Sequence, residues 1–258
     1  MKKIIFSSQQ SLFGNKEIVG FGTDKFYVKE INKNLANDII KKNHYSGKVY
    51  SNTYIHLGIF IDQELMIDAD DCYADYGLFG EKTAAQLVGV LQYGYAMNPA
   101  SMSSVVANTK INEYLELNRM WIKDKTLKYI ESQSISMSLS YIKSKYKKVK
   151  WIQSFADERC GGFGIVYQAC SFDYYGEHTS DFWELEGVVY HNVQMTRAKS
   201  GQARYLQENK ENAKRMKLRQ FRYIKFLKSK FKKDCLLKNQ PYPKHYDDSK
   251  KLRNAKVV

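Results

Sequence analysis

The segments ELNRMWI at residues 116–122 and VKWIQSFAD at residues 149–157 decide the fold. Both are short and rich in apolar residues, as buried strands are. The residues between them have apolar side chains at the spacing of one helix face, namely Ile135, Leu139, Ile142 and Tyr146. A strand, a helix and a second strand in this order predict a βαβ unit with a parallel strand pair.

Other segments extend this unit into a larger sheet. We expect strands at 25–31, 54–62, 87–97, 111–122 and 220–227, strands or a hairpin within 172–193, and helices at 32–43, 165–171 and 203–217. Ser132 or Ser134 is expected to cap the long central helix. The acidic, glycine-punctuated segment 68–82 is expected to be a loop. The chain is therefore predicted to be an α/β protein with a mixed central sheet and flanking helices.

The formal net charge of +14 is concentrated at the end of the chain. Residues 196–258 contain 20 Lys and Arg against 5 Asp and Glu, whereas residues 1–195 contain 21 against 22. We interpret 1–195 as a catalytic body and 196–258 as a basic segment of the same domain, with a helix, a closing strand and a tail. A basic segment on a neutral body predicts a polyanionic partner, although a solvated tail would look the same.

Composition restricts the cellular setting. The four cysteines at 72, 160, 170 and 235 show no CxxC spacing, so we expect reduced thiols in a cytoplasmic protein rather than a disulfide frame or a zinc cluster. No apolar run is long enough to span a membrane, and the first apolar stretch is too short for a signal peptide. No membrane partner is expected.

Arg119 is the first candidate functional residue, because it lies inside an apolar strand. A buried arginine is costly unless an anion meets it. It could pair with Glu113 or Glu116 or lie on an exposed strand face, or it could bind a carboxylate or phosphate through its two-pronged guanidinium. Open sheets bind ligands at the carboxyl ends of their strands, where Arg119, the start of the central helix and Asp157 are all expected.

Three further side chains have both structural and functional interpretations. His44, in NHYSG at 43–47, could be a base or a metal ligand, or an exposed residue in the turn that ends a helix. Asp157, in SFADERCGGFG at 154–164, could transfer protons or bind a metal, or it could simply form a turn. Tyr167, on the next helix, is either a core residue or a catalytic one.

Six segments in order carry a family resemblance: NHYSG, LVGVLQYG, ELNRMWI, YIESQSIS, SFADERCGGFGIVYQAC and the closing FRYIKFL with QPYPK. Together they resemble the Mom family of phage DNA-modification proteins from about residue 43 to residue 244. The family is similar to the acetyltransferase (GNAT) fold. The resemblance implies an enzyme that converts adenine in double-stranded DNA to N6-(methylcarbamoyl)adenine, also called acetamidoadenine, and so protects phage DNA from restriction.

The resemblance also implies roles for individual residues. By motif position, the functional residues fall on His44, Tyr45, Arg119, Ser132, Asp157 and Tyr167. Arg119 and Ser132 would then bind the group donor, and the other four would be catalytic. The family is further proposed to hold iron, and His44, Tyr45 and Asp157 would supply a nitrogen and oxygen ligand set for it.

The donor is left open by the sequence. Acetyltransferases carry an Arg/Gln-x-x-Gly-x-Gly phosphate loop before the central helix, but KDKTLKYIESQSIS at 123–136 contains no glycine. Transfer of an acetyl group would also leave out the nitrogen of a CH2–CO–NH2 substituent. The donor could therefore be acetyl-CoA or a glycine-derived two-carbon unit.

An enzyme acting on the N6 of a paired adenine must extrude that base. Aromatic candidates for stacking on it are Tyr45, Tyr54, Tyr93, Trp121 and Tyr167. Residues 197–233 are expected to bind phosphates, especially through Arg215, Lys217, Arg219 and Arg222. Two alternatives remain: an N-acetyltransferase acting on a protein or small-molecule amine, and a DNA-binding protein without catalytic activity.

Overall fold

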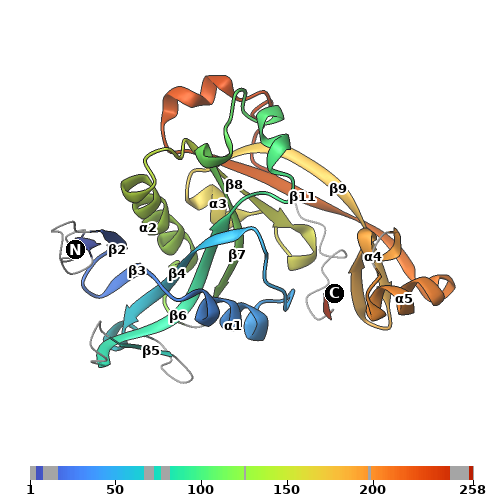
Figure 1. Cartoon of the computed structure of the whole chain (residues 1–258), viewed down its shortest axis with the longest axis horizontal. Coiled ribbons are helices and arrows are strands. Elements are labelled where there is room, and N and C mark those ends of the chain that lie inside the picture. Colours follow the sequence, from blue (N-terminus) through green and yellow to red (C-terminus); the bar gives the residue numbers. More distant parts are fainter. Residues whose placement is uncertain are drawn as a thin grey trace.

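The computed structural model describes residues 4–7, 17–66, 73–76, 82–124, 126–196, 199–244 and 256–257. Its strands form one sheet in the order β1-β2-β3-β4-β6-β7-β8-β11-β9-β10-β12, with β5 also paired to β6 (Figure 1). The strands are β1 (Ile4–Ser7), β2 (Ile18–Gly22), β3 (Phe26–Glu30), β4 (Thr53–Asp62), β5 (Tyr73–Tyr76), β6 (Lys82–Gly94), β7 (Tyr114–Ile122), β8 (Trp151–Asp157), β9 (Asp173–Leu185), β10 (Val188–His191), β11 (Lys214–Phe226) and β12 (Lys256–Val257).

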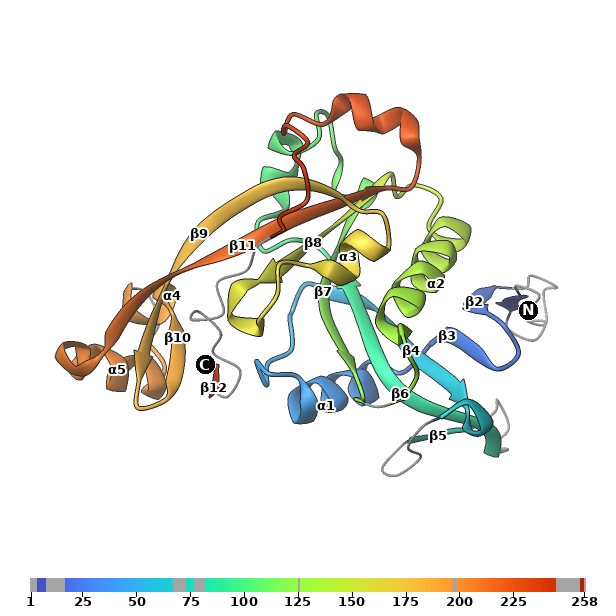
Figure 2. The same ribbon diagram turned by 180° about the vertical axis from the view of Figure 1, so that it is seen from behind.

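Helices cover both faces of this sheet (Figures 1 and 2). The α-helices are α1 (Lys33–Asn43), α2 (Ile130–Lys145), α3 (Ile165–Ala169), α4 (Asn192–Thr196) and α5 (Gly201–Glu208). The main core lies between the sheet and α2, and a smaller core lies under α1 on the opposite face. The predicted mixed sheet with flanking helices is confirmed. Among the described residues, no helix combines the length and apolar content needed to cross a membrane.

The predicted βαβ unit is present. β7 and β8 are parallel and are joined by α2, which buries Ile135, Leu139 and Ile142. The predicted serine cap of α2 is wrong, because the helix begins after Tyr129, which has a positive φ of 62° and no capping side chain. The Ser132 hydroxyl instead donates to the Tyr129 carbonyl oxygen.

Two other element predictions are corrected. The helix expected at 203–217 ends at Glu208, and residues from Lys214 onward belong to β11, because this strand finds partners in both β9 and β8. The loop expected at 68–82 contains the short strand β5, and its remaining residues up to 81 lie outside the described part of the chain.

The outer halves of β9 and β11 project beyond the end of β8 (Figures 1 and 2). β11 pairs with β8 only from Gln220 to Phe226, whereas its residues 214–219 pair with β9 alone. With β10, α4 and α5 these halves form a projection, which we call the arm. Two small hydrophobic clusters around Phe182 and Leu206 give the arm its own cores.

Candidate active site

A cavity of about 310 Å³ lies where β7 and β8 separate. The two strands pair only from Tyr114–Trp151 to Glu116–Gln153, although both continue further. The cavity is lined by the diverging strand ends, the turn after α1 and the start of α3. Five of the six residues expected to act together line it, namely His44, Tyr45, Arg119, Asp157 and Tyr167.

A β-bulge lies beside the cavity. Gln92 of β6 pairs with Arg119, and Tyr93 pairs with Leu117, so Asn118 has no partner in this register. An extra residue of this kind changes the face to which the following side chains point. Bulges are frequent next to active sites, where they redirect a side chain.

The bulge moves Arg119 out of the hydrophobic core. Cross-strand partners share one face of a sheet. Tyr93 lies on the α2 face, where its hydroxyl contacts Ser138. Gln92 lies on the α1 face, where its amide donates to Asn37. Arg119, as the partner of Gln92, therefore lies on the α1 face, whereas an unbroken strand would have placed it in the core beside α2.

The guanidinium of Arg119 is held without a carboxylate partner. Nε donates to the Lys48 carbonyl oxygen at 3.2 Å and Nη1 donates to the Asn118 carbonyl oxygen at 2.7 Å. The group also lies over the Tyr50 ring at 5.5 Å. The structural alternative of a pair with Glu113 or Glu116 is wrong, because among the described residues Arg119 forms no ion pair. Its positive charge is thus free to meet a ligand.

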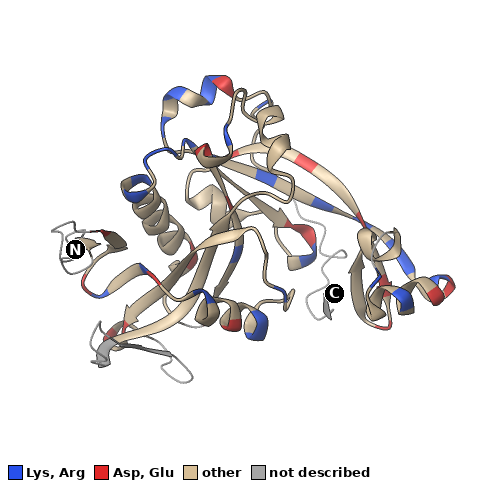
Figure 3. Cartoon of the chain, viewed as in Figure 1, with Lys and Arg blue, Asp and Glu red and all other residues tan. Residues whose placement is uncertain are grey.

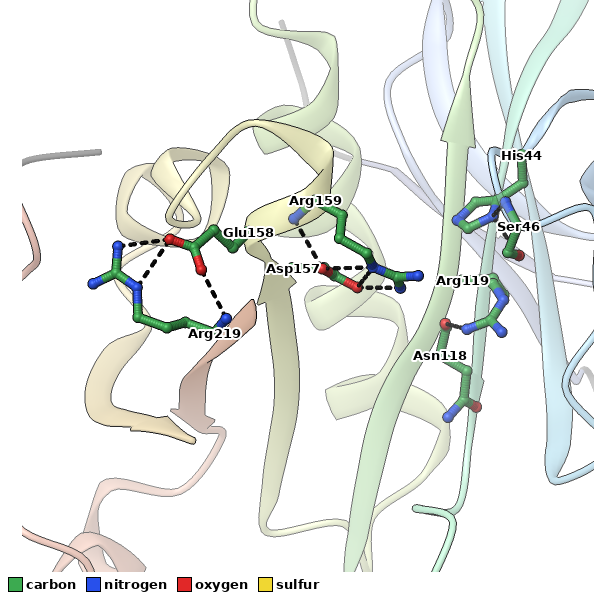
Figure 4. Close-up of polar contacts among 8 residues, drawn as sticks. All are labelled: His44, Ser46, Asn118, Arg119, Asp157, Glu158, Arg159 and Arg219. Atoms are coloured by element: carbon green, nitrogen blue, oxygen red, sulfur yellow. Dashed lines mark hydrogen bonds and ion pairs between the residues drawn. The ribbon is translucent and has the colours of Figure 1, made fainter. Parts of the chain in front are cut away.

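His44 and Tyr45 follow the last residue of α1 and enter the cavity side by side. Their rings lie 4.2 Å apart, and Nδ1 of His44 is 2.8 Å from the Ser46 hydroxyl (Figure 4). Burial and the charges of Arg119 and Arg159 lower the pKa of His44 to about 4. The imidazole is therefore neutral at neutral pH and is a weaker base than an ordinary histidine.

Asp157 and the neighbouring residues are fixed by two ion pairs at the end of β8. Nε of Arg159 lies 3.0 and 2.9 Å from the two carboxylate oxygens of Asp157, and Nη2 contacts one of them as well. Glu158 points to the opposite side and binds Arg219 of β11 (Figure 4). Burial opposes the charge on Arg159, but the bonds to Asp157 outweigh it and raise its pKa.

Sequence analysis missed Arg159. Its guanidinium lies over the rings of Phe182 at 4.3 Å and Tyr45 at 5.9 Å, so it joins the arm to the cavity. The available signal was an arginine two residues after Asp157, just before the glycine-rich turn. Such spacing allows a local carboxylate–guanidinium pair, but it does not show that the pair is buried.

Tyr167 combines core packing with cavity lining. It is 8% exposed, and its ring lies 5.7 Å from Phe172 and 5.4 Å from Tyr223. Burial raises its pKa to about 12, so its hydroxyl stays protonated. The preceding turn needs Gly164, which has φ +89°, and a Cβ there would lie 2.4 Å from the Tyr223 ring. This glycine lets α3 start close to the sheet and bring Tyr167 to the cavity.

Ser132 is the predicted site residue that does not line the cavity. It is half-buried in the first turn of α2, with its hydroxyl donating to the Tyr129 carbonyl oxygen. Cys160, which was not predicted as a site residue, does line the cavity beside Tyr45. Burial raises the pKa of its thiol to about 11, so it is a thiol and not a thiolate.

The side chains present do not fit the iron site that the family resemblance implies. Within the described ranges, no three His, Cys, Asp or Glu side chains are grouped as metal ligands. Both oxygens of Asp157 are already bound by Arg159. The two guanidiniums that lower the pKa of His44 would also repel a cation. The donor set and its charge therefore argue against a metal held by His44, Tyr45 and Asp157.

The aromatic residues proposed for base stacking are divided by the fold. Tyr45 and Tyr167 line the cavity. Tyr93 is fully buried in the core, Trp121 packs against the core under α1, and the ring of Tyr54 packs at a tilt against that of Tyr95. Of the five, Tyr45 is the one that both lines the cavity and remains substantially exposed, at 48%.

The four basic residues expected to contact phosphates all lie on β11 but differ in their surroundings. Arg215 pairs with Asp181 at 2.7 Å on the arm, next to Lys217. Arg219 is bound to Glu158, which is fully buried. Arg222 lies over the Phe155 ring at 5.1 Å.

Figure 3 shows that acidic and basic residues are mixed on the arm, and that further lysines gather on the 3-10 segment η6 (Ser229–Asp234).

Comparison with known proteins identifies the class of protein. A sequence model of the Mom protein family matches residues 25–244, so the chain belongs to that family. It is 43% identical over 233 residues to a protein named methylcarbamoylase mom from Escherichia phage Mu, with 88% of each chain covered.

Solved structures give a weaker similarity. A ribosomal-protein-S5-alanine acetyltransferase from Vibrio fischeri is 11% identical with a TM-score of 0.42, covering 81% of this chain and 96% of that one. An N-acetyltransferase from Staphylococcus aureus is 12% identical with a TM-score of 0.40, covering 80% and 100%. Scores this low carry no conclusion about activity or donor.

Proposed function

We propose that the protein is a transferase that converts adenine in double-stranded phage DNA to N6-(methylcarbamoyl)adenine. Its relation to a methylcarbamoylase, at 43% identity over most of both chains, carries this proposal. The grouping of His44, Tyr45, Arg119, Asp157 and Tyr167 around one cavity supports it. Modified adenines would resist host restriction enzymes, and the reaction would take place in the host cytoplasm.

The reaction forms a bond between N6 of adenine and a donor carbon. The donor's leaving group keeps the bonding electron pair, and N6 loses one proton. This amine is a poor nucleophile because its lone pair is delocalised into the ring, so a base close to N6 assists the attack. We assign this role to His44, which lines the cavity and is neutral; it would act as the tautomer that donates from Nδ1 to the Ser46 hydroxyl and keeps Nε2 unprotonated. Asp157 is bound by Arg159 and would act by fixing that guanidinium.

Arg119 would bind an anionic group of the donor. Its guanidinium lines the cavity and has no ion-pair partner among the described residues. A glycine-derived unit suits this site, since it supplies the nitrogen that an acetyl group lacks, and residues 123–136 carry no glycine-rich phosphate loop. Ser132 would contact only a donor long enough to reach the first turn of α2.

The adenine would reach the cavity after extrusion from the duplex. Tyr45 is placed to stack on the extruded base, because it is exposed at the cavity and its ring adjoins that of His44. Arg215 and Lys217 on the arm would contact the phosphate backbone of the DNA without recognising its sequence. The proposal is tested by mass spectrometry of nucleosides from bacterial DNA after expression of the protein. A CH2–CO–NH2 derivative of deoxyadenosine is expected. Unmodified deoxyadenosine from cells that contain the folded protein would contradict the proposed function.

A further inference from the structure

A second cavity, of about 380 Å³, lies on the sheet face covered by the 3-10 segment η2 (Pro99–Ser104). Its walls come from η2, the first residues of β9 and the middle of β11. The charged or titratable side chains among its lining residues are Arg222, His178, Glu177 and Tyr175. Neither the family's predicted site residues nor the proposed reaction uses this cavity.

Arg222 is the unexplained group in this second cavity. Among the described residues its side chain forms no hydrogen bond and no ion pair, and its guanidinium lies over the face of Phe155 at 5.1 Å. Three other arginines, Arg159, Arg215 and Arg219, each bind a carboxylate. Burial lowers the pKa of Arg222, and Glu116 and Cys235 offset this effect only in part. None of the Arg222 nitrogens is among the buried side-chain atoms that lack a partner, so the guanidinium remains accessible from the cavity, where the oxygens of a ligand could meet it.

The acidic groups near Arg222 do not supply an acceptor for its guanidinium. Glu177 also lines the cavity, but it already accepts from Arg219 and from the Tyr174 hydroxyl. Glu116 attracts Arg222 electrostatically without lining the cavity, but its oxygens accept from Gln153 and Asn118, and burial raises its pKa. The formal charges of the lining residues Arg222 and Glu177 cancel, but Glu177 does not accept from Arg222.

The second cavity adjoins the first through one side chain. Phe155 lines the first cavity. Two lining residues of the second cavity contact the same Phe155 ring. Arg222 lies over the face of this ring, and the His178 ring is perpendicular to it at 5.5 Å. Phe155 and Arg222 are also register partners on β8 and β11, so the contact is fixed by the sheet. A transfer reaction needs two ligands whose reacting atoms meet, and two cavities with a common wall offer such an arrangement.

We infer that the second cavity is a ligand subsite in which Arg222 binds an oxyanion. The inference deepens the proposed function, because this oxyanion would belong to one of the two reactants. A phosphate next to the extruded adenine and a carboxylate of the donor share the same chemistry, since both accept two parallel bonds from a guanidinium. Arg222 would then act inside a cavity that is open to solvent rather than as one of a row of surface contacts to DNA.

The test measures anion binding without the reaction. Arg119→Met serves as the background protein, so that the first cavity no longer contributes its own arginine. Thermal unfolding is recorded with increasing inorganic phosphate, deoxyadenosine 5′-monophosphate or acetate, and dissociation constants follow from the rise in Tm. Arg222→Met is added to this background, and so is Arg222→Lys, which keeps the charge if the methionine variant fails to fold.

Phosphate, or the nucleotide, or acetate is expected to raise the Tm of the background protein. Arg222→Met should weaken that binding about tenfold or more, and Arg222→Lys should weaken it less. Lys25→Met is the matched control, because Lys25 pairs with Glu64 at the start of β3 and its loss should not alter the shift. Preference for phosphate and nucleotide assigns the subsite to DNA, and preference for acetate assigns it to the donor.

The inference is overturned if no anion raises the Tm, or if the rise is the same with Arg222→Met. Its failure is separate from failure of the proposed function. Protein that modifies adenine in cells but shows no Arg222-dependent anion binding would remove the subsite and keep the function. Arg222-dependent anion binding by a protein that leaves adenine unmodified would keep the subsite and remove the proposed function.

Discussion

Asp157 and Arg159 hold each other at the carboxyl end of β8, with both oxygens of the carboxylate bound by one guanidinium and each side chain only 10% exposed. This geometry changes the role expected for Asp157. A carboxylate bound in this way is a poor proton acceptor and a poor metal ligand. It is instead well suited to fix Arg159 between the arm and Tyr45.

The pair should behave as a unit when it is mutated. Asp157→Asn and Arg159→Met each leave one mostly buried charge unpaired, so each should lower the free energy of unfolding by about 3–5 kcal/mol. The double variant removes both charges and should recover part of that loss, while modification of adenine is lost in all three. Urea unfolding and nucleoside mass spectrometry provide the two measurements. Full modification by Asp157→Asn would show that the pair has no part in the reaction.

His44 should make stability depend on pH. Its pKa is about 4 in the folded protein against 6.5 for a free histidine, so the unfolded chain binds its proton first as pH falls. The contribution of neutral His44 to the free energy of unfolding is complete above pH 6.5 and is lost as the pH falls towards about 4. It amounts to about 3 kcal/mol. Urea unfolding across this range should show this component in the native protein and not in His44→Gln, and identical profiles would contradict the low pKa.

Arg119→Met separates the two roles considered for this arginine. The side chain bonds two backbone carbonyls and no carboxylate, so its loss should change the free energy of unfolding by only about 1 kcal/mol. Modification should fall at least about tenfold, because a charge-assisted contact to the donor is lost. Thermal unfolding of the variant measures its stability, and nucleoside mass spectrometry measures its modification of adenine. A variant that unfolds readily would favour a structural role.

Two arginines of β11 should respond differently to substitution. Arg215→Gln removes an exposed charge on the arm, so it should weaken DNA binding with little sequence preference and reduce the salt dependence of log K by about one. Binding measured at several salt concentrations tests this, with Lys25→Met as the control. An unchanged slope would exclude Arg215 from the DNA interface.

Arg219→Met should instead destabilise the fold. Glu158 is fully buried, and the substitution would remove its guanidinium partner, at a cost of about 3 kcal/mol or more. Urea unfolding measures this effect. A stable Arg219→Met protein with weakened DNA binding would show that the pair with Glu158 is dispensable and that Arg219 belongs to the interface.

The sequence predicted the centre of this fold because its signals there are local. Alternating or continuous apolar strands and the helical spacing of Ile135, Leu139 and Ile142 depend only on near neighbours. Positions at strand ends also predicted that Arg119 and Asp157 lie together, and both line one cavity, whereas the start of α2, expected at the same place, does not.

Non-local pairing accounts for what could not be predicted. The bulge at Asn118 exists only because β6 and β7 pair in a particular register, and it alone places Arg119 outside the core. Residues 214–217 favour a helix by local composition but are held as a strand by β9. The orientation of Arg222 towards a second cavity likewise depends on its register with Phe155.

The most direct test is to express the native protein, Arg119→Met and Asp157→Asn in a laboratory bacterium and to analyse nucleosides from total DNA by mass spectrometry. The account predicts a deoxyadenosine with a CH2–CO–NH2 substituent from cells with the native protein, and a strong reduction with either variant. Folded native protein that leaves deoxyadenosine unmodified, or variants that modify it equally well, would contradict the account.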